Sequence, residues 1–572
     1  MKIDETPQRK NGAELLVQTL IDHDVDVVFG YPGGAVLPIF DALYRMKPNF
    51  LNVLCRHEQG LIHAAEGYAR VTGRTGVVIA TSGPGVTNLL TGIADAMLDS
   101  LPIVVITGQV FSGLVGTDGF QEADVIGLTT PITKHNYQVK DIKDLPRIIS
   151  EAFHIASTGR PGPVVVDIPK DITEAIITED ISADFHVPGY QPTEQPNMAQ
   201  IKRLMDALQK AEKPVLLAGA GIITSRASDA LYEFIEKHPM PVVNTLQGAG
   251  AFPQTHELSL GMGGMHGSYA ANMALQESDL LINIGSRFSD RLTGKISEFA
   301  PNAKIAHIDI DPAEIGKNVD VDIPVVSDAK AALEALNALE IVSPDDTEWN
   351  QHCIENKKKY PFWYERRDTL VSPQWFIEKV ADYTNHEAIV VTDVGQHQMW
   401  AGQFSNITKP NNFVSSGGLG TMGFGIPAAL GAQLGRPDDV VTLFVGDGGF
   451  QMTSQELGTI KEYHLPVKIF IINNQSLGMV RQWQELIYDE NYSQSLLADR
   501  NPDFLKLAEA YGIKGMQITS EDQVDDALKE IFDYDGPVLV DVRVETLEKV
   551  FPMVPGGKSN TEMLGVEKPC KE

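Results

Sequence analysis

The stretch FVGDGGFQMTSQELGTIKEYHLPVKIFIINNQSLGMV, residues 444–480, contains two apolar runs that each end in polar residues. Asp447 directly follows the first run, and Asn473 and Asn474 directly follow the second. The pattern predicts a strand, a helix and a parallel strand, whose two strands are neighbours with their carboxyl ends on one edge of the sheet. Asp447 and Asn474 are therefore expected to meet at the edge where open α/β sheets bind ligands.

Two further signals support the helix between these strands. Thr453 and Glu456 have the spacing of a capping box, and the sequence His464-Leu465-Pro466 is expected to end the helix before VKIFII. The segment thus has a start signal, a stop signal and a strand on either side.

The residue types at this edge favour a metal and a phosphate. A carboxylate and an amide carbonyl are hard oxygen ligands, which suit Mg²⁺. Gly446, Gly448 and Gly449 would let backbone N–H groups approach a phosphate that the ion holds. The alternative is an ordinary glycine-rich turn in which Asp447 caps a helix, because such turns are common in α/β proteins.

Composition narrows the class of protein. The 572 residues are too many for one compact core, which predicts two to four domains. The 76 acidic side chains exceed the 46 basic ones, and the resulting net charge of −30 disfavours nucleic acid as a partner. Three distant cysteines without metal or disulfide spacing, no signal-peptide pattern and no membrane-length apolar run predict a cytoplasmic protein without a membrane partner.

The chain repeats one theme, in which a Val/Ile-rich run, a Gly-rich turn and an amphipathic helix-length segment lead to another apolar run. Strands that are apolar on both faces belong to parallel sheets covered by helices on each side, so the prediction is an α/β protein of three doubly wound domains. Proline-rich residues 185–198 and charged residues 342–373 are interpreted as linkers. The predicted domains are residues 1–184, 199–341 and 374–545, followed by a tail, 546–572, that is either a lid or disordered.

The first and third domains are interpreted as copies of one unit. A constant offset of 364 residues aligns three pairs of segments: ATSGPG (80–85) with FVGDGG (444–449), LPIVVI (101–106) with LPVKIF (465–470), and HAAEG (63–67) with PAALG (427–431). At this offset Asp447 faces Gly83, so the pair of oxygen-bearing side chains occurs in the third domain alone.

GDG at 446–448 with NN at 473–474 resembles the diphosphate and metal motif of thiamine diphosphate enzymes. The resemblance implies that Mg²⁺ is held by Asp447, Asn474 and the backbone carbonyl of Ser476. It also implies a glutamate from the first domain of a neighbouring subunit, and RHEQG places Glu58 directly after the strand-like LNVLC.

Glu58 suits the task that the resemblance assigns to it. A carboxyl group bonded to N1′ of the aminopyrimidine favours the tautomer that removes the C2 proton of the thiazolium ring. The alternative is a solvated helix start. At the offset of 364, Glu58 lies opposite Met422, which in the resembling family supports the bent shape of the cofactor. Active sites shared between subunits would require a homodimer or tetramer.

A closer resemblance covers nearly the whole chain. FGYPGGAVLPIFDAL, TSGPGVTNLLTGIADA, GTDGFQEAD, STGRPGPVVVDIPKDI, GMGGMHG, HIDIDPAEIGKN and NNQSLGMVRQWQE are similar to the catalytic subunits of the acetohydroxyacid (acetolactate) synthase family. The resemblance implies decarboxylation of pyruvate and condensation with a second pyruvate or with 2-ketobutyrate, at the start of branched-chain amino-acid synthesis. It also suggests a small regulatory subunit.

The family resemblance assigns roles to further residues. Those near the reacting end of the cofactor and the 2-ketoacid substrates would be Gly34, Ala35, Phe120, Gln121, Lys170, Arg287 and Trp483. Arg287 would pair with the acceptor carboxylate, a task that suits a planar guanidinium. Those holding thiamine diphosphate would be Gln396, His397, Met422, Met479 and the glycines of the GDGG turn. Arg287 as a strand-end arginine and Trp483 as a packing aromatic are the alternatives.

The middle domain resembles an FAD-binding domain. LLAGAGI and INIGSRF have glycine turns that are weak evidence alone, whereas GMGGMHG and HIDIDPAEIGKN are similar to FAD-binding stretches of the family. The implied flavin contacts are Gly219, Gly221, Gly264, Met265, His266, Arg291, Asp309 and Asp328, with Arg160 from the first domain. The family's flavin is structural and takes no part in turnover.

Two other functions remain open. An FAD-dependent pyruvate oxidase or a thiamine diphosphate-dependent decarboxylase would share the fold and both motifs, although Gln121, Arg287 and Trp483 together favour carboligation. A non-catalytic nucleotide-binding protein is disfavoured by the joint presence of Glu58 and the metal motif. The residues alone do not predict the preferred acceptor, and Phe111 stands where many family members have proline.

Overall fold

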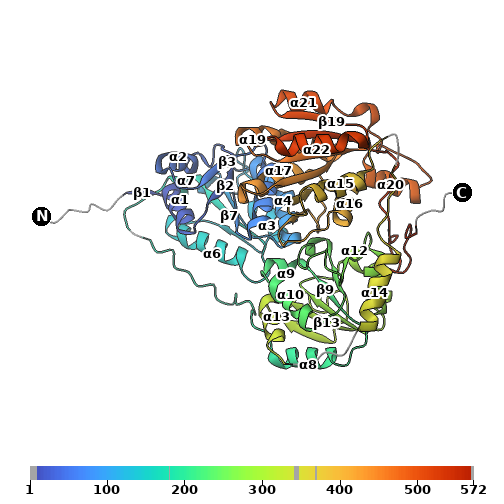
Figure 1. The fold of residues 1–572 in the computed structure, drawn as a ribbon. Helices are drawn as coiled ribbons and strands as arrows, with labels where there is room; N and C mark the ends of the chain where they lie inside the picture. The colour runs from blue at the N-terminus through green and yellow to red at the C-terminus, as the bar shows by residue number, and fades with distance from the viewer. Residues whose placement is uncertain (1–8, 180, 341–346, 367–369, 568–572) are drawn as a thin grey trace. The chain divides into compact units, whose positions relative to one another are not determined.

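The computed structural model describes residues 9–179, 181–340, 347–366 and 370–567. Within them, three six-stranded parallel sheets carry helices on both faces (Figure 1). The predicted α/β class with three doubly wound sheets is confirmed. Contacts divide the chain into two compact units, unit 1 with residues 1–191, 416–438 and 452–465, and unit 2 with residues 192–415, 439–451 and 466–572.

The first sheet has the strand order β3-β2-β4-β5-β7-β6. Its strands are β2 (Val27–Gly30), β3 (Leu51–Leu54), β4 (Gly76–Ala80), β5 (Ile103–Gln109), β6 (His135–Gln138) and β7 (Pro163–Pro169). Its helices are α1 (Gly12–Asp22), α2 (Leu37–Met46), α3 (Glu58–Thr72), α4 (Pro84–Asp99), α5 (Val125–Thr129), α6 (Leu145–Ser157) and α7 (Lys170–Glu174). β1 (Lys10–Asn11) and β8 (Ile176–Ile177) form a separate antiparallel pair. The Val/Ile-rich central strands are buried along their whole length, as a sheet covered on both faces requires.

The third sheet has the order β16-β15-β17-β18-β20-β19, which repeats the order of the first sheet strand for strand. Its strands are β15 (Ile389–Thr392), β16 (Phe413–Val414), β17 (Val441–Gly446), β18 (Lys468–Asn473), β19 (Lys514–Ile518) and β20 (Val538–Arg543). Its helices are α15 (Pro373–Tyr383), α16 (Gln396–Phe404), α17 (Gly425–Gly435), α18 (Asp447–Thr453), α19 (Leu457–Glu462), α20 (Gly478–Ile487), α21 (Phe504–Ala510) and α22 (Val524–Asp533). The shared order confirms that the two domains are copies of one fold.

A symmetric contact between α3 and α17 supports the same conclusion. A Cβ added to Gly67 would lie 2.1 Å from the carbonyl oxygen of Ala428, and one added to Gly431 would lie 1.8 Å from that of Ala64. Gly67 and Gly431, like Ala64 and Ala428, are equivalent at the offset of 364 residues. Equivalent glycines on the two copies thus let two helix backbones touch, and both helices belong to unit 1.

We expect Gly431→Ala to destabilise the protein. An alanine in the middle of a helix ordinarily stabilises it by about 0.5–1 kcal/mol relative to glycine. Here the added methyl group meets backbone atoms, and overpacking of this kind costs about 1–3 kcal/mol. Thermal unfolding of the variant is the measurement, with Gly113→Ala as the control because its added methyl would meet open space. A higher melting temperature for Gly431→Ala would contradict the close helix contact.

The middle sheet has the order β11-β10-β9-β12-β13-β14. Its strands are β9 (Pro214–Ala218), β10 (Val242–Asn244), β11 (Ser259–Met262), β12 (Leu280–Ile284), β13 (Lys304–Asp309) and β14 (Ile323–Val326). Its helices are α8 (Met198–Leu208), α9 (Ala220–Thr224), α10 (Ser228–Lys237), α11 (Tyr269–Glu277), α12 (Asp290–Thr293) and α13 (Ala329–Asn337). Numbered within the domain, the order is 3-2-1-4-5-6, which is typical of dinucleotide-binding domains, and the switch point lies between β9 and β12.

The segments outside the sheets are partly structured. The predicted linker 342–373 contains α14 (Thr347–Lys359), whose Trp349 is buried and donates a hydrogen bond to the Pro214 carbonyl; residues 342–346 and 367–369 of this linker lie outside the described residues. The tail packs on the middle domain as far as it is described, since Val554 N–H donates to the Met265 carbonyl and Asn560 donates to the Leu292 carbonyl. Among the described residues, no helix combines the length and apolarity that crossing a bilayer demands.

Candidate active site

Asp447 and Asn474 follow neighbouring strands. β17 pairs in parallel with β18, with Gly446 opposite Ile472, so both residues lie at the same sheet edge. This confirms the predicted strand, helix and strand arrangement. The first asparagine of the pair has a structural contact, because the Asn473 side chain donates a hydrogen bond of 2.7 Å to Asp541. The Asn474 side chain donates to Gln396 Oε1, and its Oδ1 accepts a hydrogen bond of 3.2 Å from the Ser476 N–H, which leaves the second lone pair of that oxygen for a metal ion.

The buried Asp447 carboxylate is incompletely hydrogen-bonded by the described residues. The side chain is 0% exposed, Asn501 donates a 2.6 Å hydrogen bond to Oδ2, and Oδ1 makes no hydrogen bond of good geometry to any described residue. Burial raises the pKa of Asp447 to about 6, although the Asn501 hydrogen bond and nearby backbone N–H groups lower it. A divalent cation would offset the free-energy cost of burying the charged carboxylate, because it stabilises the charged form. The donor set of Asp447 and Asn474 therefore fits Mg²⁺.

The glycine-rich turn leaves space that side chains would fill. A Cβ at Gly446 would lie 3.1 Å from the His397 ring, one at Gly448 would lie 2.4 Å from Leu477, and one at Gly449 would lie 2.4 Å from Asp393 Oδ1. Burial lowers the pKa of His397 to about 3, so this ring is neutral and its buried Nε2 lacks a hydrogen-bond partner among the described residues. Gln396 and His397 begin α16, which is separated from the end of β15 by three residues.

The predicted capping box does not form. Thr453 ends α18, and Glu456 ends the short 3₁₀ helix η6 (Ser454–Glu456) that comes before α19. The Thr453 hydroxyl donates to the Gly423 carbonyl instead. The Glu456 carboxylate accepts hydrogen bonds of 2.9 and 3.1 Å from the backbone N–H groups of Arg56 and His57 at the start of α3. The Glu456 carboxylate therefore caps α3 and not its own helix. The spacing of residues within one segment could not predict this contact.

Glu58 is the first residue of α3 and follows β3, as predicted. The Asn88 side chain on α4 donates a 3.0 Å hydrogen bond to Glu58 Oε2, which leaves Oε1 for another group. Glu58 lies at the carboxyl end of the first sheet, where the turns after β2, β4, β5 and β7 also emerge.

The other predicted residues of the first domain follow the ends of its strands. Gly34 and Ala35 lie in the turn after β2, where a Cβ at Gly34 would meet nothing within 4 Å, and Ala35 N–H donates to Thr81. Gln121 has a φ of 61° and its backbone contacts Gly83, which follows β4. Lys170 begins α7 after β7, with its Nζ 5.9 Å from the Phe111 ring centroid. Phe120 is 90% exposed and is not drawn into this group.

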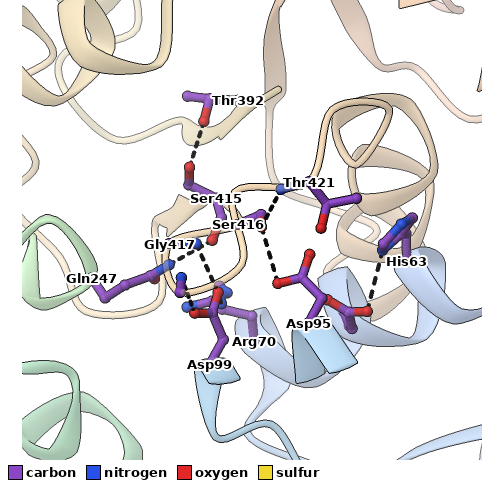
Figure 2. A network of polar contacts seen from close by, with 12 residues as sticks. His63, Arg70, Asp95, Asp99, Gln247, Thr392, Ser415, Ser416, Gly417 and Thr421 are labelled. Carbon is purple, nitrogen blue, oxygen red and sulfur yellow. Dashed lines mark hydrogen bonds and ion pairs between the residues drawn. The ribbon is translucent and has the colours of Figure 1, made fainter. Parts of the chain in front are cut away.

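Met422 lies in the loop before α17, and two aspartates of α4 hold this loop (Figure 2). The Ser416 hydroxyl donates to Asp95 and accepts a hydrogen bond from the Thr421 N–H, so the loop folds back on itself. The Asp99 carboxylate accepts hydrogen bonds from the N–H groups of Gly417 and Gly418. These contacts lie within unit 1 and bring the loop of the third domain against α4 of the first.

A buried acidic cluster adjoins this loop, and sequence reasoning missed it. His63, Glu66 and Asp95 are fully buried, and their ligand atoms lie within 4.8 Å of one another. Burial and then the nearby Asp99 raise the pKa of Glu66, while burial and then Glu66 raise that of Asp95 to about 7. Mutual repulsion and burial thus favour a protonated member in the pair. The spacing of acids on α3 and α4 is the sequence signal that could have indicated it.

The residues predicted for the middle domain follow the ends of its strands. Gly219 and Gly221 follow β9 and contact Gly285 after β12, where a Cβ on Gly219 would lie 2.1 Å from the Gly285 carbonyl oxygen. The backbones of both strands therefore come together at the topological switch point. This fits a dinucleotide, which binds in the crevice at such a point.

Some of the remaining residues predicted to contact flavin have protein partners. Gly264 and Met265 contact the backbone of Arg291, whose side chain is 69% exposed and pairs with Asp290. Asp328 caps α13 by accepting hydrogen bonds from the N–H groups of residues 330 and 331.

Four other predicted residues are buried or hydrogen-bonded to the protein itself. His266 is buried, and burial lowers its pKa to about 4. Asp309 ends β13 and accepts a hydrogen bond from the Asp311 N–H. Arg287 follows β12, and its carbonyl accepts a hydrogen bond from Asn318. Arg160 donates a 2.9 Å hydrogen bond from Nε to the Ser100 hydroxyl.

Helix α20 carries Met479 and Trp483, both half-buried, at the edge where Asn474 and Ser476 lie. Sequence reasoning missed two other residues of this helix. Arg481 and Gln482 are 0% exposed, and both bond to the backbone of the tail. Arg481 and Gln482 precede Trp483 in the sequence, but two polar residues in a helix indicate only a polar face and do not predict burial.

Three domain families match the chain in order. They are described as the thiamine pyrophosphate enzyme N-terminal TPP binding domain, over residues 10–128, the central domain, over residues 201–336, and the C-terminal TPP binding domain, over residues 393–542. Each match falls on one of the three sheets.

Whole-chain relatives have one described activity. The acetolactate synthase large subunit of Lactococcus lactis is 50% identical over 556 residues, which are 97% of this chain and 96% of the relative. The isozyme 2 large subunit of Escherichia coli is 49% identical over 97% of this chain and 99% of its own length. The probable acetolactate synthase large subunit of Methanocaldococcus jannaschii is 48% identical over 97% of this chain and 95% of its own length.

Two outer sheets with the same strand order, and a sheet of dinucleotide-binding order between them in the sequence, agree with these matches. The identity is close to one half, and the alignments cover 96% and 99% of the length of the first two relatives, so this chain matches nearly all of each. The chain belongs to the acetolactate synthases of the thiamine pyrophosphate enzyme family and is a catalytic subunit of this kind.

Proposed function

We propose that Asp447, Asn474 and the backbone carbonyl of Ser476 hold Mg²⁺ for the cofactor diphosphate in acetolactate synthesis. The observation that carries the proposal is the buried Asp447 Oδ1, which has no hydrogen-bond partner of good geometry among the described residues, at the sheet edge shared with Asn474. The glycines 446, 448 and 449 leave room for the diphosphate, and Gln396 and His397 border it. Met479 is proposed as a further cofactor contact on α20.

Glu58 is proposed as the catalytic carboxyl group. When bound, thiamine diphosphate supplies a nucleophilic thiazolium carbon and an acceptor for the electrons released by decarboxylation of pyruvate. Glu58 would hold a proton at the pyrimidine N1′, because Asn88 occupies one carboxyl oxygen and orients the other. Met422, held by the loop that Asp95 and Asp99 anchor, is proposed to support the cofactor from the other side.

The 2-ketoacids are proposed to bind beside the reacting carbon. Gly34 offers open space for substrate, Lys170 follows β7 of the same sheet, and the Gln121 backbone lies against Gly83, which follows β4. Arg287 would pair with the carboxylate of the second 2-ketoacid, and Trp483 would bias the acceptor pocket. Carboligation with pyruvate or 2-ketobutyrate would make this the first common step of branched-chain amino-acid synthesis.

FAD is proposed for the middle domain in a structural role. The 3-2-1-4-5-6 strand order and the close approach of Gly219 and Gly285 at the switch point support a dinucleotide there. Gly221, Gly264, Met265 and His266 border the same carboxyl edge. Arg291, Asp309, Asp328 and Arg160 remain proposed contacts, and the exposed Arg291 side chain is available to a ligand.

The assembly is also a proposal. Several relatives are named large subunits, which supports a small regulatory partner for this chain. A homodimer or tetramer with sites shared between subunits would bring Glu58 of one chain to the proposed metal ligands Asp447, Asn474 and Ser476 of another, which we call the metal edge. We propose cytoplasmic residence and the domain limits 1–184, 199–341 and 374–545, with the tail 546–572 as a possible lid.

We expect acetolactate formation to require all three cofactors. Purified protein assayed with pyruvate should lose activity when Mg²⁺, thiamine diphosphate or FAD is omitted after each has been stripped. The products acetolactate, acetaldehyde and acetate are measured separately. Acetolactate formed equally well without FAD would contradict the middle-domain assignment, and acetate as the main product would indicate an oxidase.

A further inference from the structure

The C-terminal tail is joined to helix α20 by a reciprocal pair of hydrogen bonds. Val550 N–H donates to Gln482 Oε1 at 2.9 Å, and Gln482 Nε2 donates to the Val550 carbonyl at 3.2 Å. Gln482 and Val550 are both 0% exposed. The side-chain amide of Gln482 therefore pairs with the tail as a backbone group would.

The same amide begins a chain of contacts that ends at the metal edge. Gln396 Nε2 donates to Gln482 Oε1 at 2.8 Å and to the Glu548 carbonyl at 2.8 Å. Asn474 Nδ2 donates to Gln396 Oε1 at 3.0 Å. Gln396 and Asn474 are 2% and 5% exposed, so no bulk water competes for these bonds. All of these residues belong to unit 2.

The tail sets the direction of every amide in this chain. A backbone carbonyl can only accept a hydrogen bond, so the Glu548 and Val550 carbonyls require the NH₂ groups of Gln396 and Gln482 to face them. Gln396 then has only its oxygen to offer Asn474. Asn474 must donate its NH₂ group, which directs its Oδ1 to the opposite side, toward the loop of Ser476.

A metal ion needs the oxygen of Asn474, because an NH₂ group is no ligand for Mg²⁺. An asparagine that could rotate its amide by half a turn would present the wrong atom for part of the time. The buried chain of amides removes this freedom before the ion binds, and such support of a ligand changes metal affinity by about 10–100-fold in known sites.

We propose that Gln482 is a positioning residue: together with the Glu548 carbonyl, its Oε1 holds the NH₂ group of Gln396, and Gln396 in turn fixes the direction of the Asn474 amide. The proposal rests on the metal role of Asn474 proposed above. It assigns the described tail a function in preparing the metal site.

The test compares two glutamines that anchor the same tail. Gln482→Met removes the donor and the acceptor but keeps the length of the side chain. Gln403→Met is the matched control, because Gln403 donates to the Phe551 and His266 carbonyls and has no bond to Gln396. The dissociation constant of Mg²⁺ is measured by calorimetry on metal-free protein in the presence of thiamine diphosphate, and kcat is measured at saturating Mg²⁺.

Gln482→Met is expected to weaken Mg²⁺ binding by about tenfold, with kcat near that of the parent protein once Mg²⁺ is saturating. Gln403→Met is expected to bind Mg²⁺ as the parent does. Unchanged Mg²⁺ affinity in Gln482→Met would overturn the proposal, as would equal weakening in Gln403→Met, which would trace the effect to tail packing alone.

Two further variants separate the possible failures. If Gln482→Met does not fold, Gln482→Asn replaces it in the test. This variant keeps an amide on a side chain that is shorter by one methylene group, and it should also weaken Mg²⁺ binding. Asn474→Ala tests the ligand itself. Unchanged Mg²⁺ affinity in Asn474→Ala would refute the proposed metal site, whereas weakening there without weakening at Gln482 would refute only the positioning role.

Discussion

Glu58→Gln is expected to reduce acetolactate formation by about 10²–10⁴-fold, the usual contribution of a positioned acid or base. Glutamine keeps the size of the side chain and can still accept the hydrogen bond from Asn88. It cannot exchange a proton with the pyrimidine N1′, so the loss should fall on catalysis. The measurement is the rate of acetolactate formation at saturating Mg²⁺, thiamine diphosphate and pyruvate.

Cofactor binding distinguishes a catalytic defect from a folding defect. The variant should retain the rise in melting temperature that Mg²⁺ with thiamine diphosphate produces in the parent, because its metal edge is intact. Glu14→Gln is a suitable control, since Glu14 belongs to a capping box at the start of α1 and has no site role. Parent-like acetolactate formation by Glu58→Gln with bound cofactor would remove Glu58 from the mechanism.

Asp447→Asn is expected to weaken Mg²⁺ binding by more than about 100-fold, because loss of an anionic ligand should exceed the effect of losing its supporting residues. The substitution preserves shape, and the Asn501 contact can persist through the amide oxygen. The stabilisation by Mg²⁺ and thiamine diphosphate should therefore disappear together with activity. Calorimetric titration of Mg²⁺ and thermal unfolding with and without both ligands are the measurements.

The metal-free protein offers an internal check on this variant. Burial opposes the charged form of Asp447, so a neutral asparagine should leave the metal-free fold at least as stable at neutral pH. Asp141→Asn is the control, because this exposed aspartate caps the 3₁₀ helix η3 (Ile142–Asp144) of the first domain, outside the sheet that carries Asp447. Mg²⁺ affinity equal to the parent in Asp447→Asn would show that another group holds the ion.

The internal repeat made much of the fold predictable. An offset of 364 residues relates the outer domains in the sequence alone, and the identical strand orders and the paired glycines Gly67 and Gly431 agree with it. Buried parallel strands follow from continuous Val/Ile runs, since only a sheet covered on both faces can bury them. The positions of Asp447, Asn474 and Glu58 at strand ends follow from the same pattern, because parallel strands share one carboxyl edge.

Contacts between distant segments were beyond local patterns. Glu456 and Thr453 have the spacing of a capping box, yet Glu456 caps α3 and Thr453 donates to the Gly423 carbonyl. These partners lie far away in the sequence, so local spacing could not predict them. The direction of the Asn474 amide likewise depends on tail carbonyls more than 70 residues away in the sequence.

The fold class, the copied domains and the residue types of the metal edge follow from the amino-acid sequence alone, because periodicity, repetition and strand ends are properties of local segments. Three other features required the folded chain: which Asp447 oxygen lacks a partner among the described residues, which asparagine pairs with Asp541, and which side-chain amides have their orientation fixed by hydrogen bonds. Those features depend on burial and on hydrogen-bond partners from segments that meet only when the chain folds.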